Sequence, residues 1–420
     1  MTPNEIVVVC QVFYPDSQST SQLLTDLLRG MSGGGLQITV ITGYTAKQDG
    51  VFPPRRDRLG AGIAIRRAGV AIDYKRSLVR RGLHYLCYLA GSTIELWKLR
   101  KSSFVFGVTN PPFAPIWLWL LSKFFVRRYQ IMLQDIYPEG LVGVGRMKPH
   151  GMLTRFWRAG NRKALQSADR VLVLGRDMGE LVQTVYGVPS ARIDYVPHWS
   201  AFEAAEAVPA EKAQMMEKLG LQGKFIVQYS GNMGLWHDIE SIVKAAAKLQ
   251  KHVEIHFLML GDGVRRAKAQ QLAEELKLGN MTWLPFQPLE NLNDSLSCCH
   301  LALISQRGGL KGVAVPCKLY GILASGRAVL AMVPPGAEVD LVVQEEKCGR
   351  TISPGDVDEL VMAVLELEAN RPLVQKMGEN AFRAYRQKYT LGSAIRKFQE
   401  IWSKTAVGNR DGGAHPVCRI

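Results

Sequence analysis

Cysteine is scarce and follows no pattern in this chain of 420 residues, which holds seven cysteines and no C-x-x-C pair. A scattered, odd-numbered set predicts neither a disulfide framework nor a zinc site, and it fits a reducing compartment. The first residues also lack the basic segment of a secretory signal and lead straight into an apolar, strand-like run. We therefore expect a cytoplasmic protein.

Long hydrophobic runs are missing as well. The apolar run at residues 113–126 has about 14 residues and contains Lys123, whereas a helix needs roughly 20 apolar residues to span a bilayer. Trp117, Trp119 and the two arginines that follow the run favour contact with lipid headgroups, and a core helix is an equal alternative. The run therefore predicts a buried or interfacial helix.

Acidic residues are few in the first half of the chain. Residues 1–200 hold 26 Lys and Arg against 13 Asp and Glu, whereas residues 201–420 hold 26 against 24. The imbalance is marked in residues 51–101, with 12 basic and 3 acidic side chains, and in residues 140–168, with six basic and none acidic. Such density attracts an anionic membrane or a nucleic acid. Because the chain has no nucleic-acid-binding signature, we expect an anionic membrane surface; a face that only aids solubility is the alternative.

Short β-branched runs alternate with helical patterns, which predicts an α/β fold. Strands are expected in the first half at residues 6–12, 38–42, 63–65, 104–109, 129–134, 170–174 and 193–197. They recur in the second half at residues 225–230, 254–260, 281–286 and 301–305. The predicted organisation is an N-terminal domain at 1–200, a linker at 201–221, a C-terminal domain at 222–385, a helix at 386–404 that packs back on the N-terminal domain, and a disordered tail at 405–420.

The long helix expected at residues 77–100 has apolar positions at helical spacing and basic residues near its ends. It suits a membrane interface as well as the face of a sheet. We therefore predict an acceptor-binding and membrane-facing set that consists of Arg76, Arg80, Arg81, Trp117 and Trp119.

Residues 305–330 carry the clearest signal for chemistry. They begin as a Gly-rich, cationic loop with Arg307 and Lys311 and become an apolar run of helical spacing after Pro316. Proline suits the first position of a helix, and the valine before it cannot cap the free N–H donors of the first turn. Those donors and the ammonium of Lys318 predict a site for an anion such as a diphosphate. A surface helix capped by water is the alternative.

Glycines end two strands of the second half, Gly231 in GNMG and Gly261 and Gly263 in GDG. Glycine at such a place lets a ligand approach the backbone. The GDG turn is not a dinucleotide fingerprint, because no third spaced glycine follows it. In the first half, Asp135 follows a strand in DIYPEG, at the sheet edge that carries chemistry in open parallel sheets; a structural turn is the alternative there.

Several of these segments occur together in one known family. The order YSGNMG, LGDG, LPFQP, PCKLYGILASGRAVLA and GAEVDLVV, with FYPDSQSTSQLLTDL and DIYPEG before them, resembles the family 4 glycosyltransferases of GT-B fold. It is most similar to the exopolysaccharide enzymes of the colanic-acid type. The resemblance implies an α/β fold of two Rossmann-like domains that face a cleft, with C-terminal helices that cross back. It also implies a retaining hexosyltransferase that needs no metal or other cofactor and uses a UDP- or GDP-linked sugar.

The resemblance assigns Gly231 and Asn232 to the loop near the donor diphosphate, Lys318 to the phosphates, and Glu338 to the ribose or the sugar. The donor-binding set that we predict is Gly231, Asn232, Gly261, Gly263, Arg307, Lys311, Pro316, Lys318 and Glu338.

The chain departs from the family's pattern at two pairs of positions. Asn232 and His237 stand where many members have Arg and Lys, and Val313 and Gly321 stand where a pair of glutamates is usual. Lys318 is thereby left as the principal cation for the donor. His237, like His198, is expected to have a structural or donor-contacting role rather than to be a general base.

The predicted reaction transfers a sugar to a polyprenyl-diphosphate-linked or oligosaccharide acceptor in the synthesis of a cell-surface polysaccharide. Lys318 is expected to stabilise the leaving diphosphate, and Asp135 to contact the acceptor hydroxyl. We expect the protein to associate peripherally with the inner face of the cell membrane. A sugar-nucleotide epimerase of the same fold and a non-catalytic membrane-docked scaffold are the alternatives.

Overall fold

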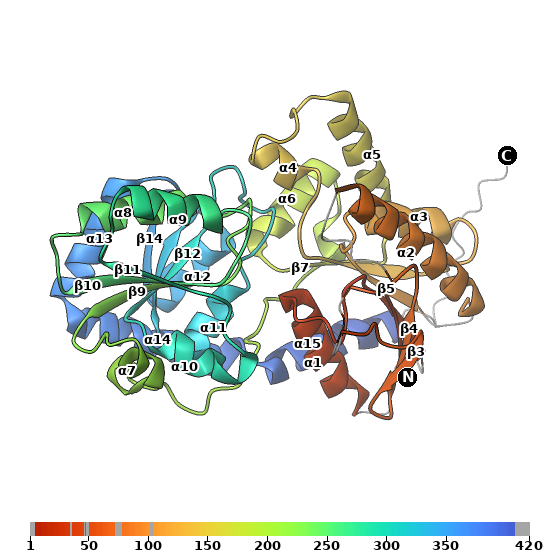
Figure 1. The fold of residues 1–420 in the computed structure, drawn as a ribbon. Coiled ribbons are helices and arrows are strands. Elements are labelled where there is room, and N and C mark those ends of the chain that lie inside the picture. Colours follow the sequence, from red (N-terminus) through yellow and green to blue (C-terminus); the bar gives the residue numbers. More distant parts are fainter. Residues whose placement is uncertain are drawn as a thin grey trace.

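The computed structural model describes residues 5–33, 36–45, 47, 50–71, 78–100 and 104–407. Its first sheet has eight strands in the order β3-β4-β2-β1-β5-β6-β7-β8 (Figure 1). The strands are β1 (Glu5–Val9), β2 (Gln37–Thr42), β3 (Arg56–Leu59), β4 (Ile63–Arg67), β5 (Phe104–Val108), β6 (Tyr129–Leu133), β7 (Arg170–Val173) and β8 (Ile193–Tyr195). Every pairing is parallel except that of the edge strand β3 with β4. The carboxyl ends of these parallel strands therefore share one edge.

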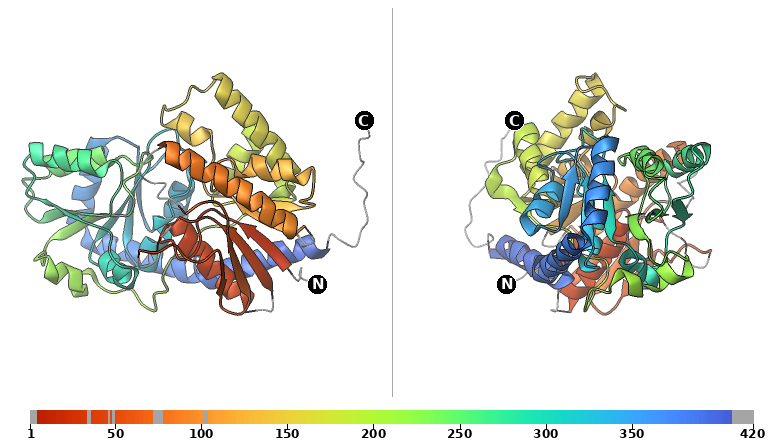
Figure 2. Two further views of the ribbon diagram at one scale, coloured as in Figure 1. Left: turned by 45° about the vertical axis from the view of Figure 1, so that its right-hand side comes forward. Right: turned by 90° about the vertical axis from the view of Figure 1, so that its left-hand side faces the viewer.

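Helices cover both faces of this sheet. The helices of this half are α1 (Ser19–Ser32), α2 (Leu78–Lys98), α3 (Ala114–Ser122), α4 (Glu139–Gly143), α5 (Met152–Ser167) and α6 (Arg176–Tyr186). Contacts run from α2 to α3, from α3 to α5 and from α5 to α6, so these four form one layer. Helix α1 lies on the other face beside the C-terminal helix α15 (Leu391–Val407), as the views in Figure 2 show. This arrangement follows from the right-handed crossovers between parallel strands.

The second sheet is fully parallel and has the order β11-β10-β9-β12-β13-β14. Its strands are β9 (Phe225–Ser230), β10 (Ile255–Leu260), β11 (Met281–Leu284), β12 (Leu301–Ser305), β13 (Ala328–Met332) and β14 (Gly349–Ile352). The helices are α7 (Gln214–Lys218), α8 (Ile239–Lys248), α9 (Arg266–Glu275), α10 (Leu292–Ser297), α11 (Lys318–Ala324), α12 (Glu338–Glu346), α13 (Val357–Ala369) and α14 (Arg371–Lys388). Short 3-10 turns lie at Ser190–Arg192, Ala210–Lys212 and Leu289–Asn291.

The chain returns to the first domain at its C-terminal end. In α15, the ring of Trp402 meets Phe104 and Phe106 of β5 edge-on, with ring centroids 5.8 and 5.5 Å apart. Phe398, also in α15, is fully buried. The predicted α/β fold, with two parallel-sheet domains and a C-terminal helix that crosses back, is confirmed.

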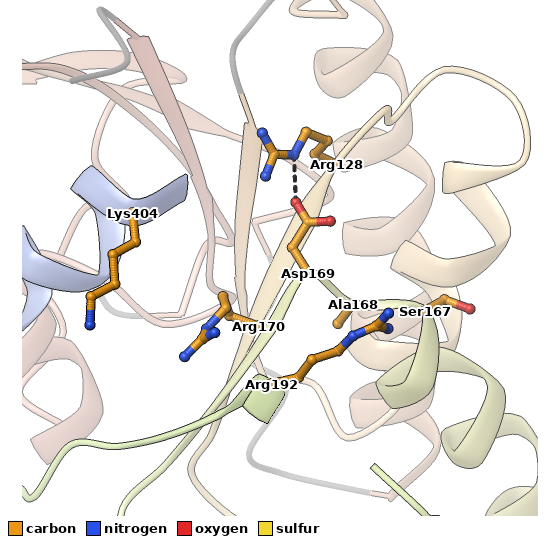
Figure 3. Close-up of a pocket in the computed structure, with 7 residues that line it drawn as sticks. All are labelled: Arg128, Ser167, Ala168, Asp169, Arg170, Arg192 and Lys404. Atoms are coloured by element: carbon orange, nitrogen blue, oxygen red, sulfur yellow. Dashed lines mark hydrogen bonds and ion pairs between the residues drawn. The ribbon is translucent and has the colours of Figure 1, made fainter. Parts of the chain in front are cut away.

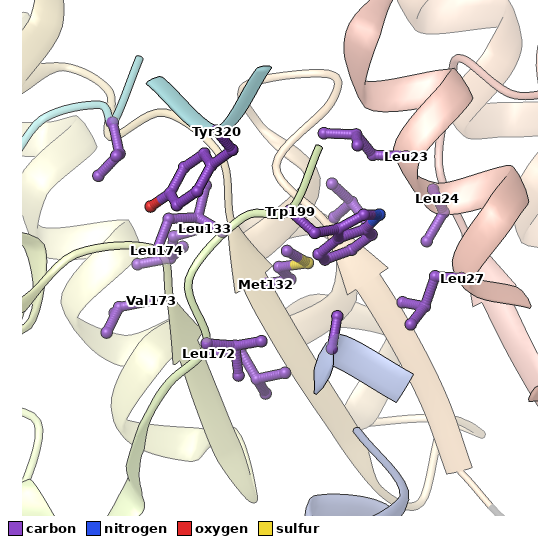
Figure 4. Close-up of a cluster of buried hydrophobic side chains, with 14 of the residues drawn as sticks. Leu23, Leu24, Leu27, Met132, Leu133, Leu172, Val173, Leu174, Trp199 and Tyr320 are labelled. Atoms are coloured by element: carbon purple, nitrogen blue, oxygen red, sulfur yellow. The ribbon is translucent and has the colours of Figure 1, made fainter. Parts of the chain in front are cut away.

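Apolar side chains also fill the contact between the two domains. Figure 4 shows Tyr320 of α11 lying near Leu133 and Leu174, which follow or end strands of the first sheet. Trp199 lies between Met132 of β6 and the leucines of α1 in the same view. One continuous buried cluster thus contains residues of both sheets, while a second cluster belongs to the C-terminal domain alone.

Several boundaries differ from those expected. Helix α11 begins at Lys318 rather than at Pro316, and it ends at Ala324, because Gly326 takes a left-handed φ of 64° and leads into β13. The sequence pattern did not reveal α5, whose exposed face is largely apolar near its start. Helix α15 continues to Val407, and the remainder of the expected tail at 408–420 lies outside the described residues.

Candidate active site

Lys318 is the first residue of α11, and its ammonium nitrogen is buried at the end of β9. Nζ lies 3.7 Å from the centre of the Tyr229 ring and makes no hydrogen bond with the described residues. A Cβ atom added to Gly231 would lie 3.5 Å from Nζ, so the amine faces the glycine backbone. Burial lowers the pKa of Lys318 to about 7. The site therefore holds a cation that has no counter-ion among the described residues.

The loop after β9 is held in place by the next strand. Gly261 has a φ of 122°, and a Cβ atom there would lie 2.1 Å from the carbonyl oxygen of Gly231. At Gly263 a Cβ atom would meet the carbonyl oxygen of Met233 at 2.5 Å. Met233 N donates to the Asp262 carbonyl at 2.7 Å. The two predicted donor glycines thus support the loop that carries Gly231, because only glycine fits so close to another backbone.

His237 and Asn232 stand at the two positions where the family that the sequence resembles often has cations. His237 Nδ1 accepts a hydrogen bond from Gly234 N at 3.0 Å. Burial, together with the nearby charge of Lys318, lowers the pKa of His237 to about 3. The Asn232 carbonyl accepts from the Tyr229 hydroxyl at 2.7 Å. Both side chains are neutral at pH 7, so they add no positive charge to that of Lys318.

Glu338 begins α12 and is buried, with 1% of its surface exposed. Its carboxylate accepts from the backbone N of Arg176 and from the Tyr195 hydroxyl, each at 2.7 Å. The Arg176 guanidinium donates to the same carboxylate at 3.1 Å. The predicted donor residue is thus engaged by two residues of the N-terminal domain.

The cationic loop before α11 is also tied to the N-terminal domain. Gly312 N donates to Asp177 Oδ2 at 2.8 Å. Ile136 N donates to the Val313 carbonyl at 2.9 Å, and Asp135 pairs with Ala314 as an isolated antiparallel bridge. The backbone around Asp135 therefore lies against the loop that leads to Lys318.

Asp135 follows β6 at the sheet edge that faces this loop. Burial raises the pKa of its carboxyl to about 7. Burial raises the pKa of the Tyr137 phenol, the charge of Asp135 raises it further, and Arg81 of α2 acts in the opposite direction. Helix α2 connects β4 to β5 of this parallel sheet, so it begins at the same carboxyl edge as the segment that contains Asp135.

Arg307, Lys311 and Pro316, the remaining predicted donor residues, lie in or beside the loop that precedes α11, and each contacts a different residue. Arg307 N donates to the Trp236 carbonyl at 2.9 Å. The Lys311 side chain is exposed, and its Nζ would lie 2.9 Å from a Cβ atom on Gly336. The Pro316 carbonyl accepts from Leu319 N at 3.2 Å, in the turn that precedes α11.

The residues of the predicted membrane-facing set differ in their exposure in the structure. Trp117 Nε1 donates to Thr93 Oγ1 at 3.0 Å, and Trp119 is half-buried beneath the ammonium groups of Lys123 and Lys163. Both tryptophans therefore pack between helices of the layer. Arg80 and Arg81 are exposed on α2. Arg76 lies outside the described residues.

His198 follows β8 at the contact between the domains, with its ring centroid 6.1 Å from that of Tyr320. Burial lowers its pKa to about 4. The imidazole is therefore neutral at pH 7 and packs among aromatic rings.

A basic cavity of about 260 Å³ lies at the opposite edge of the first sheet, where β6, β7 and β8 begin (Figure 3). Arg128 pairs with Asp169 at 2.7 Å, and Arg170 binds both carboxylate oxygens of Asp194. Lys404 approaches from α15. These ion pairs join the starts of neighbouring strands, at the sheet edge opposite to the one that carries Asp135, so the cavity has a structural explanation.

Arg176, Asp177 and Tyr195 reach the site, and the sequence analysis missed them. Arg176 and Asp177 open α6 directly after β7, at the same sheet edge as Asp135. The sequence does show a charged pair, Arg176 and Asp177, just beyond a predicted strand, and this position could have indicated a site. Their partners lie more than 130 positions away in the chain, so the pairing itself could not be predicted.

Comparisons with known proteins agree with this architecture. The family model "Glycosyl transferase 4-like domain" matches residues 21–199, and "Glycosyl transferases group 1" matches residues 211–384. The chain is 26% identical over 328 residues to the probable glycosyltransferase WbjE of Pseudomonas aeruginosa. The aligned region covers 77% of this chain and 80% of that protein. It is 25% identical over 326 residues to the putative colanic acid biosynthesis glycosyl transferase WcaI of Escherichia coli K12, with 75% and 79% covered.

A solved structure with the same fold is that of Alr3699/HepE from Anabaena in complex with UDP. It aligns with a TM-score of 0.69 over 95% of this chain and 100% of that one, at 14% sequence identity. The two sheets, the returning helix and both family models agree with the resemblance seen in the sequence. The chain therefore belongs to the family 4 glycosyltransferases of GT-B fold.

Proposed function

We propose that this glycosyltransferase transfers a hexosyl group from a nucleotide-diphosphate sugar, with retention of configuration and without a metal ion. The acceptor is a polyprenyl-diphosphate-linked sugar or an oligosaccharide in the synthesis of a cell-surface polysaccharide. The names of WbjE and WcaI support the polysaccharide role, and the fold that the chain shares with a UDP-bound protein supports the class of donor.

The observation that carries the proposal is the buried, unpaired ammonium of Lys318. Taking a cation out of water without a partner is costly, and the lowered pKa of Lys318 reflects that cost. The nitrogen faces Tyr229 and Gly231 at the carboxyl end of β9, where open α/β sheets bind ligands. An anionic group that enters there gains a charge-assisted contact and relieves the unpaired charge.

The reaction creates charge at the place where this ammonium lies. Breaking the bond between the sugar and its phosphate puts negative charge on the leaving diphosphate, so Lys318 binds the transition state more strongly than the ground state. In a same-face transfer, the departing phosphate oxygen can take the proton of the acceptor hydroxyl.

Asp135 is suited to orient that acceptor. Its carboxyl belongs to the N-terminal domain, and its backbone pairs with the loop that leads to Lys318. A group whose pKa lies near 7 exchanges between its two forms at neutral pH, so it can accept a hydrogen bond from the acceptor hydroxyl once ionised.

Metal independence is supported by the partners of two carboxylates that have the spacing of a metal-binding pair. Asp356 and Asp358 have the Asp-x-Asp spacing of a metal-binding pair. Asp356 accepts from Glu359 N at 2.9 Å as the cap of α13, and Asp358 pairs with Lys248. Both therefore have structural partners, and Lys318 is the group that faces the donor loop.

The test uses the purified full chain with UDP- and GDP-linked hexoses. Release of nucleotide is measured with a polyprenyl-diphosphate-linked acceptor, with an oligosaccharide acceptor and with neither, and the product's anomeric configuration is read by NMR. We expect acceptor-dependent release and retention. Inversion, or isomerisation of the donor without any acceptor, would refute the proposed transfer.

A further inference from the structure

Helix α2 presents an apolar stripe to solvent. Five large side chains on it are exposed: Val79 by 82%, Leu83 by 52%, Leu86 by 68%, Ile94 by 57% and Trp97 by 54%. Their spacing of three, four or eight residues places them on one side of the helix, and the exposed Ala90 lies in the longest gap. The stripe therefore runs along nearly the whole helix.

The opposite side of α2 already supplies the contacts that hold the helix. His84, Tyr88, Ser92 and Leu96 recur every four residues and are at most 2% exposed. His84 Nδ1 is bonded to Gln11 at 2.9 Å. A surface helix normally has polar residues opposite such a buried face. The outer stripe of α2 is therefore not needed for packing within the described chain.

Neighbouring helices extend this apolar surface. Leu120 and Phe124, at the end of α3, are exposed by 48% and 81%. At the start of α5, exposed apolar side chains follow one another: Met152 by 89%, Leu153 by 65% and Phe156 by 78%. Since α2, α3 and α5 belong to one layer, we name their exposed apolar side chains the outer apolar face. The left view of Figure 2 shows α2, in orange, along the outside of the N-terminal domain.

Basic side chains accompany the outer apolar face. Helix α2 has three and α5 has four, of which Arg158 is paired with Glu139, whereas Glu95 is the one acidic residue in the sequences of α2, α3 and α5. Glu95 is paired with Arg66 and Lys98. Contact with a second copy of the chain would set these positive charges against each other, whereas an anionic surface would attract them.

We propose that the outer apolar face docks on an anionic lipid bilayer, with α2 lying in the plane of the interface. The stripe from Val79 to Trp97 is about 27 Å long at the rise of a helix, and its side chains would enter the boundary between headgroups and acyl chains. No helix of the described residues is long and apolar enough to cross a membrane. The contact goes beyond the proposed transfer, because it does not depend on the sugar or the acceptor.

Docking in this orientation would bring the reaction site to the bilayer surface. Helix α2 connects β4 to β5 of the parallel sheet, so its first turns lie at the carboxyl edge of the sheet, the edge that also carries Asp135. The Val79 end of the stripe therefore lies on the acceptor side of the proposed site, so a lipid-linked acceptor would not have to leave the membrane.

The experiment measures sedimentation of the full chain with vesicles of phosphatidylglycerol or of phosphatidylcholine. The test variant carries Leu86→Gln, Ile94→Gln and Trp97→Gln. A matched control carries Val253→Gln, Met362→Gln and Leu373→Gln, which replace side chains exposed by 73%, 54% and 42% in the C-terminal domain. The parent and the control should bind phosphatidylglycerol vesicles at low salt and dissociate from them as the salt concentration rises. The test variant should bind at least about tenfold more weakly, because three apolar side chains no longer enter the bilayer.

Thermal unfolding confirms that both variants fold, and light scattering gives the oligomeric state. Nucleotide release with a water-soluble oligosaccharide acceptor is measured separately, so failure of the transfer proposal is distinguishable from failure of docking. Equal vesicle binding by parent and test variant would overturn the proposal. Failure of the parent to bind phosphatidylglycerol vesicles would also overturn it. The same holds if the parent does not bind vesicles but forms a dimer that the test variant cannot form, since the outer apolar face would then be a dimer interface.

Discussion

The two domains of this glycosyltransferase use positive charge in opposite ways. The C-terminal domain buries one ammonium, Lys318, where it has no partner and a lowered pKa. The N-terminal domain has exposed basic side chains beside an apolar face, such as Arg80 and Arg81 of α2 and Arg155 of α5. A buried charge acts strongly at one point because water does not screen it, whereas exposed charges act weakly, together and at a distance. The comparison predicts different responses to mutation, salt and pH.

Removal of the buried cation should have the largest effect. Lys318→Ala should lower the rate of transfer by roughly 30-fold to 1000-fold, because one charge-assisted contact that strengthens in the transition state contributes about 2 to 4 kcal/mol. Rates are measured as nucleotide release, with circular dichroism as a check on the fold. The loss should be similar at low and moderate salt. Full activity of the variant with any donor would exclude Lys318 from the site.

Asp135→Asn should have the next largest effect on turnover. Loss of a charged acceptor of one hydrogen bond should lower kcat by roughly 10-fold to 100-fold and leave the donor KM nearly unchanged. Because burial raises the pKa of Asp135, its ionisation destabilises the folded protein increasingly from about pH 4 to about pH 7. The variant should therefore unfold at a higher temperature than the parent at pH 8. An unchanged kcat would leave Asp135 with a structural role only.

Neutralising exposed charge should affect location rather than chemistry. Arg80→Gln with Arg81→Gln should weaken binding to phosphatidylglycerol vesicles by roughly 30-fold at low salt, since each basic residue contributes about 1 kcal/mol near an anionic surface. The difference should vanish as the salt concentration rises. Lys244→Gln with Lys251→Gln, on the C-terminal domain, is the control with the same change in net charge. If the control loses as much binding, net charge rather than the α2 surface explains the attraction.

The pH dependence of donor affinity should sharpen the contrast. The folded pKa of Lys318, about 7, is below its unfolded value, so the ammonium costs stability below pH 7 and this cost fades as pH rises towards 10.5. A bound diphosphate raises that pKa again, and binding above pH 7 therefore takes up a proton. Nucleotide affinity should fall about tenfold per pH unit above 7. Calorimetry in buffers of different ionisation enthalpy counts the protons, and uptake of none would contradict the assignment.

Chelation should have the smallest effect. Excess EDTA should leave transfer unchanged, because under the proposed function Lys318, and not a metal ion bridged to carboxylates, binds the diphosphate. The measurement is the initial rate before and after dialysis against EDTA. Loss of activity that Mn²⁺ or Mg²⁺ restores would point to a different donor site.

The sequence allowed the fold to be predicted because strand and helix periods are local signals. Buried strands such as β9 and β10 stand out as apolar runs that end in glycine. Lys318 could be recognised from the segment that surrounds it. The start of α11 was wrong by two residues, because proline in the preceding turn and proline at the first helical position look alike in a sequence.

The cross-domain contacts could not be predicted, since they depend on how two separately folded units meet. Glu338 meets Arg176 and Tyr195 only in the assembled molecule. The tryptophans of α3 show a related ambiguity. Trp117 and Trp119 fit a lipid interface or a helix contact equally well in the sequence, and the structure places them between helices. In contrast, the exposed stripe of α2 became visible only when the buried side of that helix was known.

The backbone bridge between Asp135 and Ala314 has a consequence for the fate of the activated donor. Under the proposed transfer, completion of the site depends on domain closure, because separating the domains would withdraw the Asp135 carboxylate from the loop that precedes Lys318. A nucleotide sugar bound to the open enzyme then meets water without an oriented hydroxyl beside it. Because the bridge forms only when the domains meet, it would delay assembly of the reactive site until the acceptor is bound, and so limit hydrolysis of the donor.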